Sequence, residues 1–126
     1  MIHRTHRFHG YNSLRFVYKS GKTVRCPNSA LKFVYNPRRK TYRVAVVVSR
    51  KVHKSAVVRN RIRRRMYEVI RAVDPQITGP YDMVFTAFSD QLATMNYGEF
   101  AASVTSQLQK AEIIANLPTS SSENML

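Results

Sequence analysis

Apolar residues recur at helical spacing through the middle of the chain. Between residues 56 and 73 they are separated by steps of four, four, three and four positions, which places them on one side of a helix. Asp74 and Pro75 follow, and a proline inside a helix breaks it. We therefore predict a helix over residues 56–73, with a buried stripe formed by Val58, Ile62, Met66, Val69 and Val73.

Two further helices are predicted near the ends of the chain. Residues 12–20 carry Leu14, Val17 and Tyr18 on one helical face, and Gly21 follows as a helix-ending residue. Later, Asn96 and Glu99 have the spacing of a capping box that starts a last helix. The buried face of that last helix is formed by Phe100, Val104, Leu108 and Ala111.

Four segments have the pattern of strands. Residues 30–35 alternate, with Leu31, Phe33 and Tyr35 on one face and Lys32 on the other. Residues 42–49 are almost continuously apolar, which predicts a strand that is buried on both faces at the centre of a sheet. The other two strands are predicted at residues 23–25 and 81–88.

The order of these elements, α-β-β-β-α-β-α, predicts an α+β sandwich with a four-stranded sheet. A length of 126 residues suits a single domain, which we assign to residues 1–116. Residues 117–126 contain Pro118 and a run of serines, and we expect a disordered tail there. The only cysteine is Cys26, which excludes an internal disulfide and a cysteine-rich zinc site. The longest apolar run, residues 44–48, is too short to cross a bilayer, and we expect a cytoplasmic protein.

The charge of the chain is concentrated in its first part. The formal net charge is +14, but residues 1–71 contain 20 of the 21 Lys and Arg and only one acid, Glu68, a local charge of +19. Residues 72–126 contain Lys110 against six acids. A strongly cationic region of this kind is typical of a surface that binds nucleic acid.

The predicted central helix carries the densest part of this charge. Its arginines cover the arc opposite the apolar stripe, and guanidinium groups can bind phosphate oxygens through two hydrogen bonds. We therefore predict that this face contacts RNA or DNA, together with the basic loop that precedes it. The predicted contact residues are Arg50, Lys51, Lys54, Arg59, Asn60, Arg61, Arg63, Arg64 and Arg65.

Other candidate chemistry is sparse. Phe33, Tyr35 and Tyr18 could stack on single-stranded bases or could pack in the core. Three histidines recur at residues 3, 6 and 9, but arginines separate them, so a basic arm is favoured over a metal site. We predict no catalytic residue, since metal-dependent phosphoryl chemistry needs clustered carboxylates and the basic part has none.

Residues 43–68 resemble the protein subunit of bacterial ribonuclease P. The resemblance depends on the run Arg59-Asn60-Arg61 within the helix and on the preceding strand, which ends at Ser49-Arg50-Lys51. Weaker similarity extends from about Phe8 to Lys110. The resemblance implies an α+β fold in which the βαβ crossover is left-handed, against the usual rule.

The resemblance also implies a function. In this family a catalytic RNA holds Mg²⁺ and removes the 5′ leader of precursor tRNA, while the protein binds that RNA and guides the leader along a cleft. It implies no organic cofactor, and no obligate protein partner is evident. Transferred by position, the leader-cleft candidates are Leu14, Tyr18, Phe33, Asn60, Arg64 and Tyr67. Leu14 and Tyr67 depart from the family, which carries an aromatic and a basic residue there; Arg65 lies close enough to compensate for Tyr67.

Two other functions are compatible with a basic chain. A ribosomal protein of related fold would bind structured RNAs equally and would show no preference for a 5′ leader. A protein-only nuclease would cleave RNA without an RNA subunit, and the absence of a carboxylate cluster argues against it.

Overall fold

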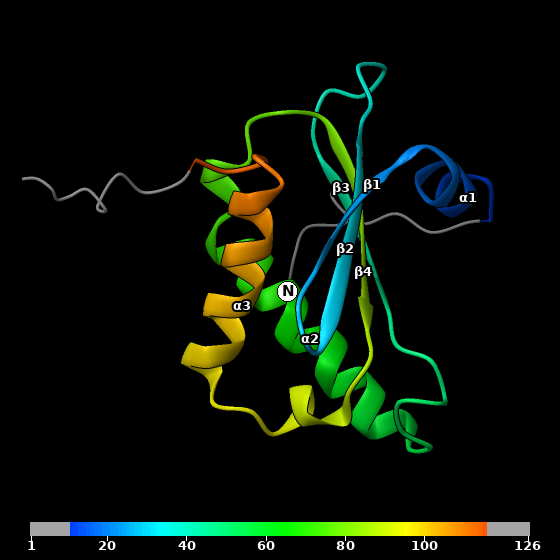
Figure 1. The fold of residues 1–126 in the computed structure, drawn as a ribbon, viewed down its shortest axis with the longest axis vertical. Helices are drawn as coiled ribbons and strands as arrows, with labels where there is room; N and C mark the ends of the chain where they lie inside the picture. The colour runs from blue at the N-terminus through cyan, green and yellow to red at the C-terminus, as the bar shows by residue number, and fades with distance from the viewer. Residues whose placement is uncertain (1–10, 116–126) are drawn as a thin grey trace, which may run out of the picture.

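A computed structural model describes residues 11–115 of the chain (Figure 1). The order of elements agrees with the predicted α+β arrangement. The strands are β1 (Lys22–Arg25), β2 (Ser29–Tyr35), β3 (Arg43–Val47) and β4 (Tyr81–Ala87). The helices are α1 (Tyr11–Ser20), α2 (Ala56–Ala72) and α3 (Tyr97–Lys110), with short 3-10 helices η2 (Asp74–Gln76) and η3 (Asp90–Ala93).

The four strands form one mixed sheet in the order β1-β2-β4-β3. β2 pairs antiparallel with β1 and β4, and β3 pairs parallel with β4 after the chain has passed through α2. The expectation that residues 42–49 lie at the centre of the sheet is wrong, because β3 is an outer strand of the described sheet. The left-handed sense of the crossover from β3 through α2 to β4 stays a prediction that the resemblance implies.

The apolar run of β3 is explained by cover on both faces of the sheet. Helices α2 and α3 lie on one face and α1 lies on the other (Figure 1). Val44 and Val46 join the main core between the sheet and the helices α2 and α3, whereas Ala45 packs with Val17 of α1 and with Val84. The continuous apolar run of β3 therefore reflects the burial of both of its faces by helices. It does not indicate that β3 has a neighbouring strand on each side.

Polar contacts fix both ends of the long helices. The Ser55 hydroxyl accepts a hydrogen bond from Val58 N at 3.4 Å and caps α2. At the other end of α2, the Tyr42 hydroxyl donates to the Asp74 carboxylate. Burial, and then the adjacent Asp74, raise the pKa of the Tyr42 hydroxyl, so that it remains a protonated donor. The predicted cap of α3 is confirmed, since Asn96 Oδ1 accepts from Gly98 N at 2.8 Å and from Glu99 N at 3.3 Å.

Some predicted features lie outside the described residues. These are the histidines at residues 3, 6 and 9 and the tail at residues 117–126. Within residues 11–115, no helix is both long enough and apolar enough to pass through a membrane.

Candidate RNA interface

The buried side of α2 holds the helix firmly against the sheet. Ile62, Met66, Val69 and Val73 are all buried in the main core, as the predicted stripe required, whereas Val58 is only partly buried. This packing fixes the rotation of the helix about its axis, and so it decides which side chains face outward.

Among the predicted contact residues on α2, two arginines face solvent. Arg61 and Arg64 are exposed, and neither side chain makes a hydrogen bond or ion pair with the part of the chain that the structure describes. Between them on the helix, half-buried Arg63 donates to the side-chain oxygen of exposed Asn60. This outward face, defined as Asn60, Arg61, Arg63 and Arg64, presents positive charge, and none of its arginines forms an ion pair with a carboxylate of the described residues.

Arg59 does not belong to the outward face. Its Nη1 donates to the backbone carbonyl oxygens of His53 at 3.0 Å and Lys54 at 2.8 Å, which ties the loop before α2 to the helix. The prediction that all five arginines form one guanidinium face therefore needs correction. The helical arc placed Arg59 correctly, but carbonyl groups of the preceding loop occupy its guanidinium.

Arg65 is the second arginine that the protein itself engages. Its guanidinium donates to the carbonyl oxygens of Leu92 at 2.8 Å and Met95 at 2.5 Å. It also stacks over the ring of Phe100, 4.9 Å from the ring centroid. Arg65 thus holds the connection between β4 and α3 against α2. Its role is a structural one, and the expectation that it faces a nucleic acid is not supported by its contacts.

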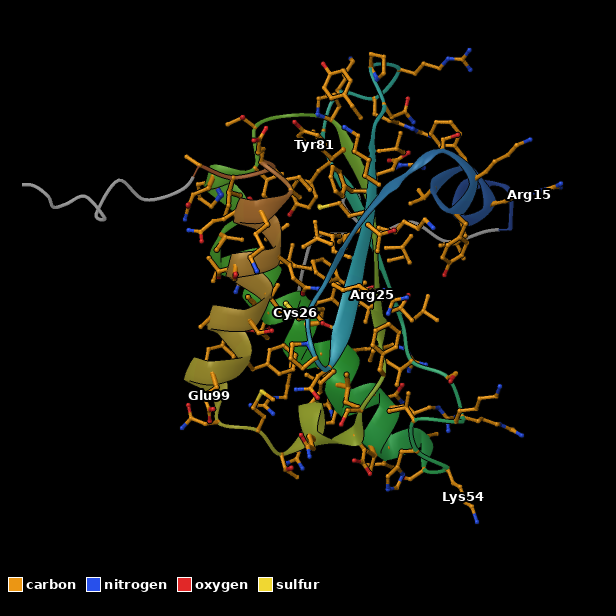
Figure 2. The ribbon with its side chains drawn as sticks, in the orientation of Figure 1. Arg15, Arg25, Cys26, Lys54, Tyr81 and Glu99 are labelled. Carbon is orange, nitrogen blue, oxygen red and sulfur yellow. The ribbon has the colours of Figure 1, made fainter. Side chains whose placement is uncertain are left out.

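The loop before α2 adds three further cations. Arg50, Lys51 and Lys54 are exposed, and Figure 2 shows Lys54 projecting from the end of the molecule where α2 begins. Half-buried His53 accepts a hydrogen bond from Ser55 N at 3.0 Å through Nδ1. Together with the contacts of Arg59, this bond fixes the shape of the loop that leads into α2.

The other face of the sheet carries α1 and a smaller apolar cluster. Val17, Ala45 and Val84 are buried there, and Leu14 packs against them. Tyr18 is 45% exposed. The ammonium of Lys32 lies over the Tyr18 ring, 6.0 Å from its centroid. This surface, which we call the α1 face, therefore combines an accessible aromatic ring with a cation.

Comparison with known proteins identifies the family. A family model described as Ribonuclease P matches residues 2–112. The chain belongs to the ribonuclease P protein family. This family provides the protein component of the RNA–protein endoribonuclease that processes the 5′ end of tRNA.

Individual ribonuclease P proteins agree with this assignment. The chain is 36% identical over 110 residues to the ribonuclease P protein component of Chloroflexus aurantiacus, which covers 87% of this chain and 80% of the relative. It is 30% identical over 121 residues to the component of a Synechococcus species, covering 92% of this chain and 89% of the relative.

Solved structures of ribonuclease P proteins share the fold. The protein from Staphylococcus aureus superposes with a TM-score of 0.77 at 22% identity, covering 86% of this chain and 97% of that one. The protein from Thermotoga maritima gives a TM-score of 0.70 at 21% identity, covering 77% and 89% of the two chains. At this level of identity the comparison shows the fold.

The structure separates the leader-cleft candidates of this ribonuclease P protein. Leu14 and Tyr18 lie on the α1 face, but Phe33 packs against the main core on the opposite side of the sheet. The side chains of a strand alternate between faces, so Lys32 takes the place beside Tyr18 that Phe33 was expected to fill. The alternation of residues 30–35 already placed Lys32 and Phe33 on different faces of the sheet. The sequence did not show which of these faces α1 covers.

Tyr67 is also displaced from its expected position. It is only 9% exposed and belongs to the main core between α2 and the sheet. The buried stripe of α2 is wider than predicted, since Ile70 and Tyr67 extend it beside Met66. A buried ring offers no surface for a base, so Tyr67 is better described as a core residue.

Sequence reasoning missed a buried ion pair at the edge of the α1 face. Asp82 is fully buried, and its oxygens accept from Arg43 Nε and Nη2, both at 2.9 Å. Asn36 Nδ2 donates to the same carboxylate at 2.9 Å. Arg43 and Asp82 are register partners on β3 and β4. The sequence signal for this ion pair was Asp82, an acid within the otherwise largely apolar strand β4.

The described residues provide no metal site of their own. No group of three or more His, Cys, Asp or Glu within residues 11–115 is arranged to hold a metal ion. The Asp82 carboxylate is already occupied by Arg43 and Asn36. The donor set of this part of the chain thus does not fit Mg²⁺.

Proposed function

We propose that the outward face of α2 and the loop before it bind the phosphate backbone of the catalytic RNA subunit. The observation that carries this proposal is the exposure of Arg61 and Arg64 without any partner among the described residues. Cations held apart from carboxylates repel one another unless an anion lies between them. Phosphate oxygens match guanidinium groups in charge and geometry.

We further propose that the α1 face holds the 5′ leader of precursor tRNA. Tyr18 offers a ring for base stacking, and Lys32 supplies a cation beside it. Leu14 packs beneath this surface. Asn60 and Arg64 lie on α2, on the other side of the sheet, and are kept with the outward face. Phe33 and Tyr67 are left out of this surface because both pack into the main core.

This arrangement assigns chemistry and binding to different molecules. Mg²⁺, the ion that supports hydrolysis when bound, would be held by the RNA subunit. The protein would neutralise phosphates and restrain the leader, which favours binding of precursor over mature tRNA. The enzyme that contains this chain would act in the cytoplasm.

Cleavage at low Mg²⁺ tests the proposal. Precursor tRNA is incubated with the cognate RNA subunit at limiting Mg²⁺, with the wild-type protein, with the Arg61→Ala/Arg64→Ala variant, or without protein. We expect faster cleavage with the wild type and little gain with the variant. Lys110→Ala, at an exposed cation in the acidic part of the chain, serves as a matched control. No gain from the wild-type protein would refute the proposal.

The leader assignment is tested separately by comparing affinities for precursor and mature tRNA. The reconstituted enzyme should bind precursor tRNA more tightly, and Tyr18→Ala should weaken that preference through the loss of one stacked base, about 1–3 kcal/mol. A general RNA-binding protein would show equal affinities for the two tRNAs.

A further inference from the structure

A hollow lies between α1 and the turn that joins β2 to β3. It has a volume of about 370 Å³ and is lined by Phe16, Tyr35, Asn36, Pro37 and Arg38. The turn stands at the end of the molecule opposite the start of α2: Figure 2 shows Tyr81, which follows Pro80 beside the turn, at one end and Lys54 at the other. This hollow is therefore separate from the outward face of α2.

Two exposed aromatic rings face this hollow. Phe16 is 43% exposed and Tyr35 is 56% exposed. The Tyr35 ring is supported by Tyr81, which meets it edge to face with 5.5 Å between ring centroids. Accessible rings of this kind can stack on a nucleobase.

The turn itself is held rigidly. Asn36 N donates to the Pro80 carbonyl at 2.8 Å, and Arg39 N donates to the Asn36 carbonyl at 3.0 Å. The Asn36 side chain accepts from Arg38 N at 3.2 Å and donates to buried Asp82 at 2.9 Å. A turn anchored through both main chain and side chain positions its cations in advance, which lowers the entropic cost of binding.

The charge around the hollow favours an anionic ligand. Arg38, Arg39 and Lys40 are consecutive and exposed, and their side chains make no ion pair within residues 11–115. The nearest carboxylate along this network, Asp82, is buried and bound by Arg43. Phosphate groups would therefore meet positive charge without competition.

Tyr35 also lines a second hollow, and the charges there show which of the two hollows suits an anionic ligand better. That hollow, of about 290 Å³, is lined by Lys22, Phe33, Tyr35 and Tyr81 but also by Glu112. The Glu112 carboxylate would repel a phosphate there. An RNA strand is better matched by the side of Tyr35 that faces Phe16 and Arg38.

We propose that the hollow between α1 and the β2–β3 turn binds one unpaired nucleotide of an RNA strand. The base would pack against Phe16 and Tyr35, and the flanking phosphates would contact Arg38 and Arg39. The inference rests on the proposed RNA-binding function and adds a contact beyond the outward face of α2 and the α1 face. This contact lies at the end of the molecule opposite the start of α2.

The test measures binding of the full-length protein to two fluorescent probes, the RNA subunit alone and a precursor tRNA alone, over a range of salt. Phe16→Ala should weaken binding to one probe by about tenfold, the loss of one stacked base. Arg38→Ala/Arg39→Ala should reduce the salt slope for the same probe by about 1.4, as expected for two single-strand phosphates. The probe that responds identifies the source of the nucleotide.

Matched controls keep the result specific. Tyr97→Ala removes a ring that is 48% exposed on α3, and Lys110→Ala removes an exposed cation; neither should change binding. Wild-type affinity and slope in both hollow variants, with Arg61→Ala/Arg64→Ala still defective, would overturn this inference and leave the proposed function standing. Absence of RNA binding by the wild type would overturn both.

Discussion

The arginines of this protein fall into two groups that the sequence does not distinguish. The inward group, Arg43, Arg59 and Arg65, binds the protein's own carboxylate or carbonyl oxygens. The side chains of the outward group, Arg61 and Arg64, make no hydrogen bond or ion pair within the described chain. Arg64 and Arg65 are adjacent in the sequence, yet the Arg64 side chain is exposed and the Arg65 guanidinium binds backbone carbonyl oxygens. Local arginine density therefore overstates the number of guanidinium groups that are available to an external ligand, because part of the positive charge is used to assemble the fold.

The largest expected effect concerns the inward group. Asp82→Ala should lower the free energy of unfolding by about 3–5 kcal/mol, because it removes the fully buried carboxylate that accepts hydrogen bonds from Arg43 and Asn36. Urea denaturation followed by circular dichroism measures the change. Asp90→Ala, at an exposed acid, is the control and should cost less than about 1 kcal/mol. Equal stability of the Asp82 variant and the wild type would show that the pair is dispensable.

Arg65→Ala should have the next largest effect on stability. It removes hydrogen bonds to two carbonyl oxygens and the contact with Phe100, at a cost of about 1–3 kcal/mol. The salt slope of RNA binding should remain that of the wild type, since Arg65 is assigned no phosphate. A shallower slope for this variant would move Arg65 into the outward group.

Arg61→Ala/Arg64→Ala should show the reverse behaviour. The free energy of unfolding should stay within about 0.5 kcal/mol of the wild-type value, since no internal contact is lost. The slope of log affinity against log salt should fall by about two for a duplex segment of the RNA subunit. Titrations by fluorescence anisotropy at several salt concentrations measure both affinity and slope. An unchanged slope would contradict the outward assignment.

The smallest effect is expected on the α1 face. Lys32→Ala removes the cation over Tyr18, an interaction of about 0.5–1 kcal/mol. We expect a loss of a few-fold in the preference of the reconstituted enzyme for precursor over mature tRNA. Lys22→Ala is the matched control, because Lys22 pairs with Phe33 and lies across the sheet from α1. An equal effect of both variants would mean that only net charge matters.

Much of the fold could be predicted because its signals are local. The stripe of α2, the cap at Asn96 and the alternation of β2 each depend on residues a few positions apart. The position of β3 at the outer edge of the sheet could not be predicted this way. Burial of both its faces depends on α1 and α2, which come from different parts of the chain.

The sequence alone determined the class of fold, the separation of charge and, through the segment around Arg59-Asn60-Arg61, the family. The tertiary structure decided which side chains remain available for RNA. The carbonyl groups that occupy Arg65 lie 27 and 30 residues away along the chain, and the partner of Arg43 lies 39 residues away. Similarly, only the docking of α1 determined that Lys32 rather than Phe33 lies beside Tyr18. Residue type and local spacing determine what a side chain can bind, but packing between distant segments determines whether that capacity is already used.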